Sequence, residues 1–204
     1  MLFQEGYVYH IKDDYFQKVQ DDKLMRNKEG GAYRPTFFCM RDQKIDGLLW
    51  VVPMSSRTEK FQAIMDKQVA RYGRCLTIVI GEYDGRQAAF LIQNMFPVTE
   101  KYLDHIHTRN GNPVPVRHSI ARQIRSNATR ARQLVYNGKN VVFPDIRRLE
   151  NLMRAELQRE ALTAQIIAEA KREALTAQII AEAKQEAADL LRSITQDPTE
   201  GRRR

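Results

Sequence analysis

Two pairs of short apolar runs, each joined by a turn that contains Asp-Gly, constrain the fold of this chain more than any other feature. The first pair is Thr36–Met40 and Leu48–Val52, around Asp46-Gly47, and the second is Leu76–Ile80 and Ala88–Ile92, around Tyr83–Arg86. Aromatic and β-branched residues favour strands, and Asp-Gly favours tight hairpin turns. The sequence therefore predicts two antiparallel hairpins and, with them, an antiparallel sheet.

Helices are predicted where apolar residues recur about every 3.6 positions and so share one face. These residues are Phe61, Ile64, Met65, Val69 and Tyr72 between Arg57 and Arg74, and Ile120, Ile124, Ala128, Ala131 and Val135 in a helix that ends at Asn137-Gly138. The other expected elements are a strand at Gly6–Ile11, a short helix from Asp13 to about Asp22, a loop at Lys23–Gly31, a kinked extension at Gln93–Val98, an irregular or edge segment at Asn110–Val116, a strand at Val141–Phe143 and a helix from about Ile146. This mixture of elements predicts an α+β fold.

The composition changes near Glu156 to Ala, Glu, Gln, Lys and Leu, and one segment then occurs twice. Ala161–Lys171 is repeated as Ala174–Lys184, a spacing of thirteen residues. Helical propensity is high there, but thirteen residues make about 3.6 turns, so the two copies point in directions more than ~100° apart. We expect a domain at residues 1–155 and a duplicated helical extension at 156–204 with a disordered end. The extension is expected to be either peripheral or an oligomer contact.

The charge of the chain favours a polyanionic partner. The 33 basic and 25 acidic side chains give a net charge of +8, and basic proteins bind nucleic acids through counterion release. No run approaches the ~18 apolar residues of a membrane span, and the N-terminus does not have the pattern of a signal peptide. Cys39 and Cys75 are isolated in apolar runs, which is typical of buried free thiols. We expect a soluble, cytoplasmic protein.

Two hydroxyl groups and several cations are predicted to gather where the first hairpin leads into a helix. Ser55 and Ser56 precede this helix, and one of its faces carries basic residues at helical spacing, namely Lys60, Lys67, Arg71 and Arg74. A helix N-terminus binds anions through its free N–H groups and its dipole. Arg34, kept out of helical geometry by Pro35, is a candidate clamp for a phosphate. The pattern suits a phosphodiester substrate.

Simpler interpretations of the same residues stay open. Ser56-Arg57-Thr58-Glu59 matches the capping box, in which Ser56 would only cap the helix. The basic residues could form an ordinary solvated face, and Arg34 could be an ordinary surface arginine. Capping alone does not explain Ser55 or the row of cations.

A second basic region extends from His105 to Pro144, where no Asp or Glu occurs. Its cations are Arg109, Arg117, Arg122, Arg125, Arg130, Arg132 and Lys139. A segment of this kind predicts docking of RNA or DNA. Tyr102, His105 and His107 could stack on unpaired bases. His105 and His107 alternate as strand residues do, so they could also be acid and base for phosphodiester cleavage, or only polar strand residues.

Other chemistries have no support in the sequence. His10 and His118 are scattered, so a zinc site lacks further ligands. No P-loop, dinucleotide-binding, zinc-protease, hydrolase-elbow or EF-hand pattern is present. We expect neither a metal nor another cofactor, and the lack of a carboxylate set for two metal ions disfavours a DNA nuclease.

Several blocks, in order, resemble one protein family. They are Gly6–Ile11, Tyr33–Cys39, Leu48–Arg57, Phe90–Val98 and Asp104–Thr108. Across residues 5 to 155 the chain resembles the toxins of type III toxin–antitoxin systems of the ToxN/AbiQ class, most closely the CptN branch. The duplicated tail departs from the family pattern.

The resemblance implies a fold similar to MazF-like toxins, with a bent antiparallel sheet, or partial barrel, flanked by helices. It also implies a metal-independent, sequence-specific endoribonuclease that acts in phage defence. This enzyme would cleave single-stranded RNA by 2′-hydroxyl attack and leave a 2′,3′-cyclic phosphate. A repetitive, pseudoknotted antitoxin RNA would be substrate and inhibitor, in a closed protein–RNA assembly, with cellular or phage RNA as target and no membrane partner.

The residue patterns and the resemblance together give a set of expected site residues. The catalytic candidates are Ser55, Ser56, Arg34 and Lys60. The expected RNA contacts are Tyr33, Thr36, Arg57, Lys67, Arg71, Asn94, His105, His107, Arg122, Arg125 and Arg132. Two rival functions are a non-catalytic RNA- or DNA-binding regulator, and a structural protein that assembles through its helical tail.

Overall fold

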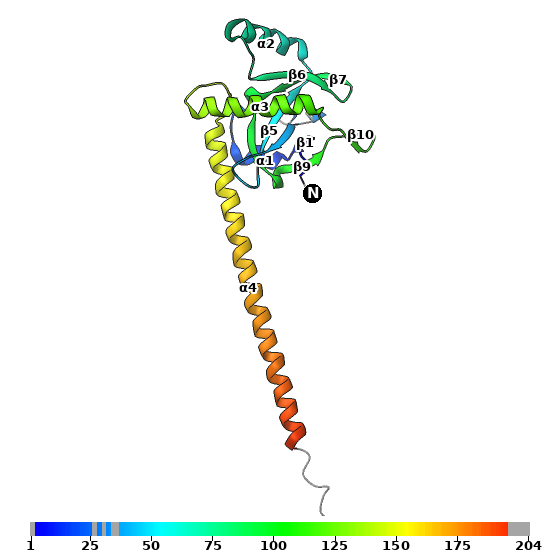
Figure 1. Ribbon diagram of the computed structural model, residues 1–204, viewed down its shortest axis with the longest axis vertical. Helices are drawn as coiled ribbons and strands as arrows, with labels where there is room; N and C mark the ends of the chain where they lie inside the picture. The colour runs from blue at the N-terminus through cyan, green and yellow to red at the C-terminus, as the bar shows by residue number, and fades with distance from the viewer. Residues whose placement is uncertain (1–2, 26–27, 30–31, 34–36, 196–204) are drawn as a thin grey trace, which may run out of the picture. The chain divides into compact units, whose positions relative to one another are not determined.

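A mixed α+β fold surrounds one antiparallel sheet, as the hairpin patterns predict. The computed structural model describes residues 3–25, 28–29, 32–33 and 37–195. The sheet has seven strands in the order β6-β7-β5-β4-β1-β9, with β8 paired to β5 (Figure 1). Its strands are β1 Val8–Ile11, β4 Phe37–Arg41, β5 Leu48–Ser55, β6 Ile78–Tyr83, β7 Arg86–Leu91, β8 Phe96–Thr99 and β9 Leu103–Ile106.

Both predicted hairpins are confirmed. β4 pairs antiparallel with β5, with Phe37 opposite Pro53, and β6 pairs antiparallel with β7, with Tyr83 opposite Arg86. Asp84 and Gly85 connect β6 and β7 with φ angles of 51° and 73°. Positive φ at both central residues defines the turn that matches the twist of paired strands, so Asp-Gly fixes this connection.

β5 is the strand on which the sheet bends. Its first half pairs with β8, from Leu48 opposite Thr99 to Val51 opposite Phe96, whereas its last residues pair with β7, with Ser55 opposite Ala89. In the described residues, the outermost strands β6 and β9 share no ladder. They approach through side chains, since the Tyr83 ring lies 5.9 Å from the ring of His107. The sheet is therefore bent but unclosed.

Helices cover both faces of the sheet because strand side chains alternate between the faces. On one face, Phe38, Trp50 and Phe90 pack against α3, His118–Tyr136. The predicted stripe of α3 is confirmed, with Ala121, Ile124, Ala128 and Ala131 buried. On the other face, the core includes α1, Asp13–Val19, and the first turns of α4, Ile146–Thr195.

α2, Thr58–Tyr72, lies beside the β6–β7 hairpin (Figure 1). Phe61 is buried there in a small cluster with Ile78, Ala89 and Leu91. The prediction of a continuous apolar face is wrong for the second half of α2, where Val69 is 44% and Tyr72 is 64% exposed. The helix therefore packs on the sheet mainly through its first turns.

The described chain divides by internal contacts into two units, residues 1–157 and 158–204, and α4 contributes to both. Leu149, Met153 and Glu156 of α4 are buried in the first unit. In the second unit, α4 continues to Thr195, and its described side chains are exposed or, at Ala188, partly exposed. The end of the predicted extension, residues 196–204, lies outside the described residues. The domain assignment and the role of the extension stay predictions.

Smaller differences from the predicted elements have local causes. Val141–Phe143 is not a strand, since Phe143 is 52% exposed and the segment forms no ladder with a described strand. The predicted loop at Lys23–Gly31 contains β2, Lys28–Glu29, paired with β3, Ala32–Tyr33. Gln93–Val98 contains a 3-10 turn, Ile92–Asn94, before β8. The irregular segment after β9 holds the two-residue strands β10, Thr108–Arg109, and β11, Asn112–Pro113.

Candidate nucleic-acid interface

The junction between β5 and α2 exposes one of the two predicted hydroxyl groups. Ser55 is half-buried at the end of β5, and its Oγ accepts a hydrogen bond from the Arg57 N–H at 3.2 Å. Ser56 is exposed, and its carbonyl accepts a hydrogen bond from the Thr58 N–H at 2.9 Å. The hydroxyl of Ser56 makes no hydrogen bond with another described residue, so it is available to a ligand.

The capping-box interpretation of Ser56 is wrong. α2 begins at Thr58, its N-cap is Arg57, and no side chain caps it. The chain leaves β5 through a bend that places Ser56 one position too early to cap the helix. The Thr58 N–H donates to the Ser56 carbonyl, but no side chain caps the N–H groups that follow it, so this end of α2 keeps the anion-binding character of a helix N-terminus.

Three of the predicted site residues cannot be placed by their side chains. Arg34 and Thr36 lie outside the described residues. The backbone of Tyr33 belongs to β3, but its side chain is not described. The predicted roles of these three residues stay predictions.

The basic residues of α2 are exposed and make no ion pair with a described residue. They are Lys60, Lys67, Arg71 and Arg74, with Arg57 just before the helix. Lys60 lies in the first turn, beside the serines. Lys67 is nine residues beyond Thr58, or roughly 14 Å along the helix axis at 1.5 Å per residue. Only Lys60 of these lysines can therefore reach a phosphate held at Ser56, and the others extend the basic surface away from it.

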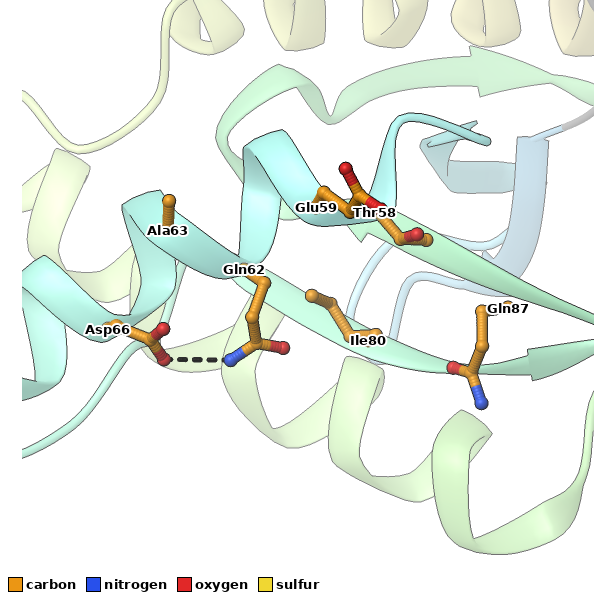
Figure 2. A pocket seen from close by; sticks show the side chains of 7 residues that line it. All are labelled: Thr58, Glu59, Gln62, Ala63, Asp66, Ile80 and Gln87. Carbon is orange, nitrogen blue, oxygen red and sulfur yellow. Dashed lines mark hydrogen bonds between the residues drawn. The ribbon is translucent and has the colours of Figure 1, made fainter.

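The neighbouring face of α2 has the opposite character. A pocket of about 490 Å³ lies between α2 and the β6–β7 hairpin and is lined by Thr58, Glu59, Gln62, Ala63, Asp66, Ile80 and Gln87. Figure 2 shows Asp66 accepting a hydrogen bond from the Gln62 amide, at 2.7 Å. The carboxylates of Glu59 and Asp66 repel a phosphate, so an RNA backbone fits the lysine face of α2 and not this pocket.

Most cations of the second basic region are paired with acids from elsewhere in the chain. Arg109 contacts Asp84 at 3.1 Å, Arg117 contacts Glu82 at 3.0 Å, Arg125 contacts Glu5 at 3.2 Å and Arg132 contacts Asp42 at 2.7 Å. Arg122, Arg130 and Lys139 are exposed and make no ion pair with a described residue. The acid-free sequence therefore does not form an acid-free surface.

Arg132, one of the predicted RNA contacts, lies in a largely buried ion pair with Asp42. Its side chain is 20% exposed and its guanidinium lies 4.0 Å from the Trp50 ring. Trp50 in turn donates a hydrogen bond to Asp42 at 2.8 Å. Burial alone would raise the pKa of Asp42, but hydrogen bonds from a backbone amide and from Trp50, together with the Arg132 charge, hold it below its ordinary value. This geometry does not support an RNA contact for Arg132.

Asn94 is also poorly placed to contact RNA. It is 9% exposed and lies in the 3-10 turn between β7 and β8. The turn is enclosed because its neighbours Ile92 and Met95 belong to the core beneath α3. Little of the Asn94 surface is therefore available to RNA.

His105 and His107 lie on the same side of their strand, as their alternation predicts. The ring of His10, on the adjacent strand β1, lies between them, 4.1 Å from His105 and 6.0 Å from His107. The sequence alone treats His10 as isolated. His10 is two residues from the core residue Val8 in a predicted strand, so the sequence could have placed both side chains on the same face. Only the pairing of β1 with β9 brings the three histidine rings together.

The described residues contain no cluster of three or more His, Cys, Asp or Glu arranged to hold a metal ion. Stacked imidazole rings direct their nitrogens side by side instead of toward one point, which explains why the three histidines do not form such a cluster. No helix in the described ranges has the length and apolar content needed to span a bilayer. Cys39 is buried and Cys75 is half-buried, and neither forms a disulfide.

Solved structures with a similar overall fold are known. One such structure is AbiQ, a lactococcal anti-phage endoribonuclease belonging to the type III toxin–antitoxin system. The two chains superpose with a TM-score of 0.56 at 15% identity, over 76% of this chain and 99% of AbiQ. This likeness shows the fold. No family model and no curated protein sequence matches the chain.

Proposed function

We propose that this protein is a metal-independent endoribonuclease toxin of a type III toxin–antitoxin system. The observation that carries the proposal is the junction between β5 and α2. There, an exposed Ser56 hydroxyl, an uncapped helix N-terminus and Lys60 occur together. The AbiQ-like fold supports the same activity, since AbiQ is an endoribonuclease of this kind of system. The CptN branch rests on the sequence blocks alone.

The proposed reaction is a transesterification within the RNA. The 2′-oxygen of a splayed nucleotide attacks the adjacent phosphorus, and the bond from phosphorus to the 5′-oxygen breaks. The 2′-hydroxyl gives its proton to a base and the leaving 5′-oxygen gains a proton, which yields a 2′,3′-cyclic phosphate and a 5′-hydroxyl. Lys60 and the α2 amides stabilise the growing charge on the phosphate, and Ser56 donates to one of its oxygens. Arg34 is proposed as a further clamp.

The unpaired cations of α2 support an RNA partner larger than the cleaved phosphodiester. Lys67, Arg71 and Arg74 continue from Lys60 along one face of α2 with no ion pair to a described residue. A positively charged track of this kind binds a single strand through successive phosphates. We assign it to a repetitive antitoxin RNA, held in a closed protein–RNA assembly, and to cellular or phage target RNA.

A non-catalytic RNA-binding regulator is the second candidate, because the basic face of α2 would serve it equally well. Ser56→Ala separates the two functions. For an enzyme, we expect cleavage to fall by about 100-fold, the scale for loss of one group that stabilises a transition state, with RNA affinity retained. Ser126→Ala, at another exposed serine, is the matched control.

The measurement is cleavage of end-labelled RNA in EDTA, with the 2′,3′-cyclic phosphate identified by its resistance to alkaline phosphatase until acid opens the ring. Equal cleavage by Ser56→Ala and wild type would refute the role of Ser56. If wild type binds RNA but cleaves none of a transcriptome-derived pool, the regulator is the better assignment. Loss of cleavage in EDTA would refute the metal-independent mechanism.

A further inference from the structure

Three histidine rings form a column at the edge of the sheet. Tyr9 of β1 lies opposite Ile106 of β9, and the His107 N–H donates to the Val8 carbonyl at 2.8 Å. In this register, which shifts at His10, the His10 ring lies across from that of His105 and 6.0 Å from that of His107. The His10 and His105 rings are 4.1 Å apart at an interplanar angle of 14°, close enough for stacking.

One end of this column is closed and the other is open. At the closed end, the Tyr83 ring lies 5.9 Å from His107, and the Tyr83 hydroxyl donates to the Val114 carbonyl at 3.3 Å. The side chain of His107 is 23% exposed. At the open end, the side chain of His105 is 58% exposed. A flat ligand can therefore extend the column at His105 but not at His107.

The column is held in place by acidic neighbours at both ends. The Asp104 carboxylate lies 2.9 Å from Nδ1 of His105. The Asp84 carboxylate lies 3.7 Å from Nε2 of His107 and is itself held by Arg109 at 3.1 Å. These contacts restrict rotation of the outer rings, so a ligand that stacks on His105 meets a preorganised surface.

His10 keeps the centre of the column uncharged. Burial, reinforced by the nearby His105 and His107, lowers its pKa from 6.5 to about 4, against an opposing effect of Asp104. Nδ1 of His10 is buried and makes no hydrogen bond. Tyr83 and Asp84 contact His107, and Asp104 contacts His105.

The column lies near the proposed cleavage site and on the same face of the sheet as Met54. Tyr9 is opposite Phe37, and Phe37 is opposite Pro53, so Tyr9 is level with Pro53 across β4. With strands ~4.8 Å apart, the Cα atoms of Tyr9 and Pro53 are separated by roughly 10 Å, and His10 and Ser56 follow these two residues by one and three positions. This span is short compared with the ~4–16 nucleotides that one single-strand-binding fold contacts.

We infer that the outer face of His105 is a stacking site for one unpaired base of a single-stranded RNA whose scissile phosphate lies beside Ser56. This assignment rests on the proposed ribonuclease function. Stacking on an imidazole face is tolerant of base identity because every base has a π-face. The site would thus splay one nucleotide out of the strand and fix the position of the phosphate that follows.

The test uses a short, mixed-sequence 2′-O-methyl oligoribonucleotide that carries 2-aminopurine and cannot be cleaved by attack of a 2′-hydroxyl. Anisotropy reports its binding and fluorescence quenching reports stacking. His105→Ala is expected to weaken binding by about 10- to 100-fold, the range for losing one stacked base, and to relieve quenching. His105→Phe restores both to within about threefold because it keeps an aromatic face. His118→Ala, at an exposed histidine outside the column, is the matched control.

The stacking site is refuted if wild type does not bind or quench the probe, or if His105→Ala binds and quenches as wild type does. It is also refuted if His105→Phe is as weak as His105→Ala, because a ring nitrogen would then matter instead of the ring face. Cleavage of unmodified RNA is scored separately. If wild type stacks on the probe but does not cleave RNA, the ribonuclease function is refuted and the RNA-binding site is retained. If wild type cleaves RNA and His105→Ala binds and quenches the probe as wild type does, only the stacking site is refuted.

Discussion

α2 and the region around α3 carry similar numbers of basic residues but differ in how many of those charges are free. The five cations from Arg57 to Arg74 make no ion pair with a described residue. Around α3, four arginines of a longer acid-free segment are paired with Asp84, Glu82, Glu5 and Asp42. A basic run in a sequence is therefore a basic surface only if folding brings no acids to it.

The largest expected effect comes from removing free charge on α2. Replacing Lys67, Arg71 and Arg74 by Gln is expected to weaken binding of an uncleavable 2′-O-methyl oligoribonucleotide by about 10- to 100-fold at low salt. It should also reduce the slope of log affinity against log salt by about 2, since each contact with a single strand contributes ~0.7. Anisotropy titrations over a range of NaCl concentrations measure both quantities.

The matched control for the α2 variant removes three paired charges instead of three free ones. Arg117→Gln, Arg125→Gln and Arg154→Gln, each at an arginine paired with an acid, together change the net charge by the same amount, and we expect affinity within about threefold of wild type. Equal weakening in the two triple variants would contradict the comparison, because overall charge and not its placement would then govern RNA binding.

The second prediction concerns stability instead of binding. Arg132→Ala leaves the Asp42 carboxylate, 1% exposed, without its cation. We expect a loss of about 2–3 kcal/mol in unfolding free energy, somewhat below the range for a broken buried pair because Asp42 keeps its other hydrogen bonds. Urea unfolding measures the loss, and the neighbouring exposed Arg130→Ala should change stability by less than ~0.5 kcal/mol. A loss of RNA affinity in folded Arg132→Ala would restore the RNA role of this residue.

The third prediction gives the pH dependence of the Arg132–Asp42 pair. Because the folded pKa of Asp42 lies below its ordinary value of 3.8, the stability of the pair is present above pH 3.8 and is lost as pH falls through the folded pKa. The difference in unfolding free energy between wild type and Arg132→Ala should stay constant from pH 7 to about pH 4 and narrow below it. Urea unfolding at each pH checks this, and narrowing already at pH 6 would assign the effect to another group.

Local patterns predicted the elements of the fold well. Asp84-Gly85 specifies its own turn, and the stripe of α3 follows from helical spacing alone. Patterns that need a partner from far along the chain were less informative. Arg132 forms an ion pair with Asp42, ninety residues away, and His10 stacks on His105 only because β9 pairs with β1. The sequence contains both members of each pair but not the sheet order that joins them.

The candidate site was predicted in part for the same reason. Ser55, Ser56 and Lys60 are neighbours in the sequence, so their gathering at the β5–α2 junction needs only the boundary between a strand and a helix. The capping-box interpretation is wrong because the bend after β5 makes Arg57, and not Ser56, the N-cap of α2. The burial of Asn94 could not be read from its sequence neighbours because it depends on the core beneath α3.

The smallest expected effect is that of removing the helical extension. Residues 158–204 contain eight basic and eight acidic side chains, so their removal leaves the net charge, and with it the contrast between α2 and α3, unchanged. Truncation after Leu157 should alter RNA affinity and cleavage by less than about twofold and stability by less than ~1 kcal/mol. Anisotropy, cleavage assays and urea unfolding of the truncated protein measure these quantities.

Truncation after Ala155 is the informative comparison, because it also removes Glu156. Lys18, Lys101 and the Tyr102 hydroxyl all donate hydrogen bonds to the Glu156 carboxylate, which is buried. Burial alone would raise its pKa, but the hydrogen bonds from Lys101, Lys18 and Tyr102 lower it. The shorter protein should therefore lose about 2 kcal/mol or more of stability, whereas the longer one should not. Equal stability of the two truncated proteins would show that Glu156 does not stabilise the packing of α4 on the domain. Loss of cleavage after truncation at Leu157 would show that the extension has a role in activity.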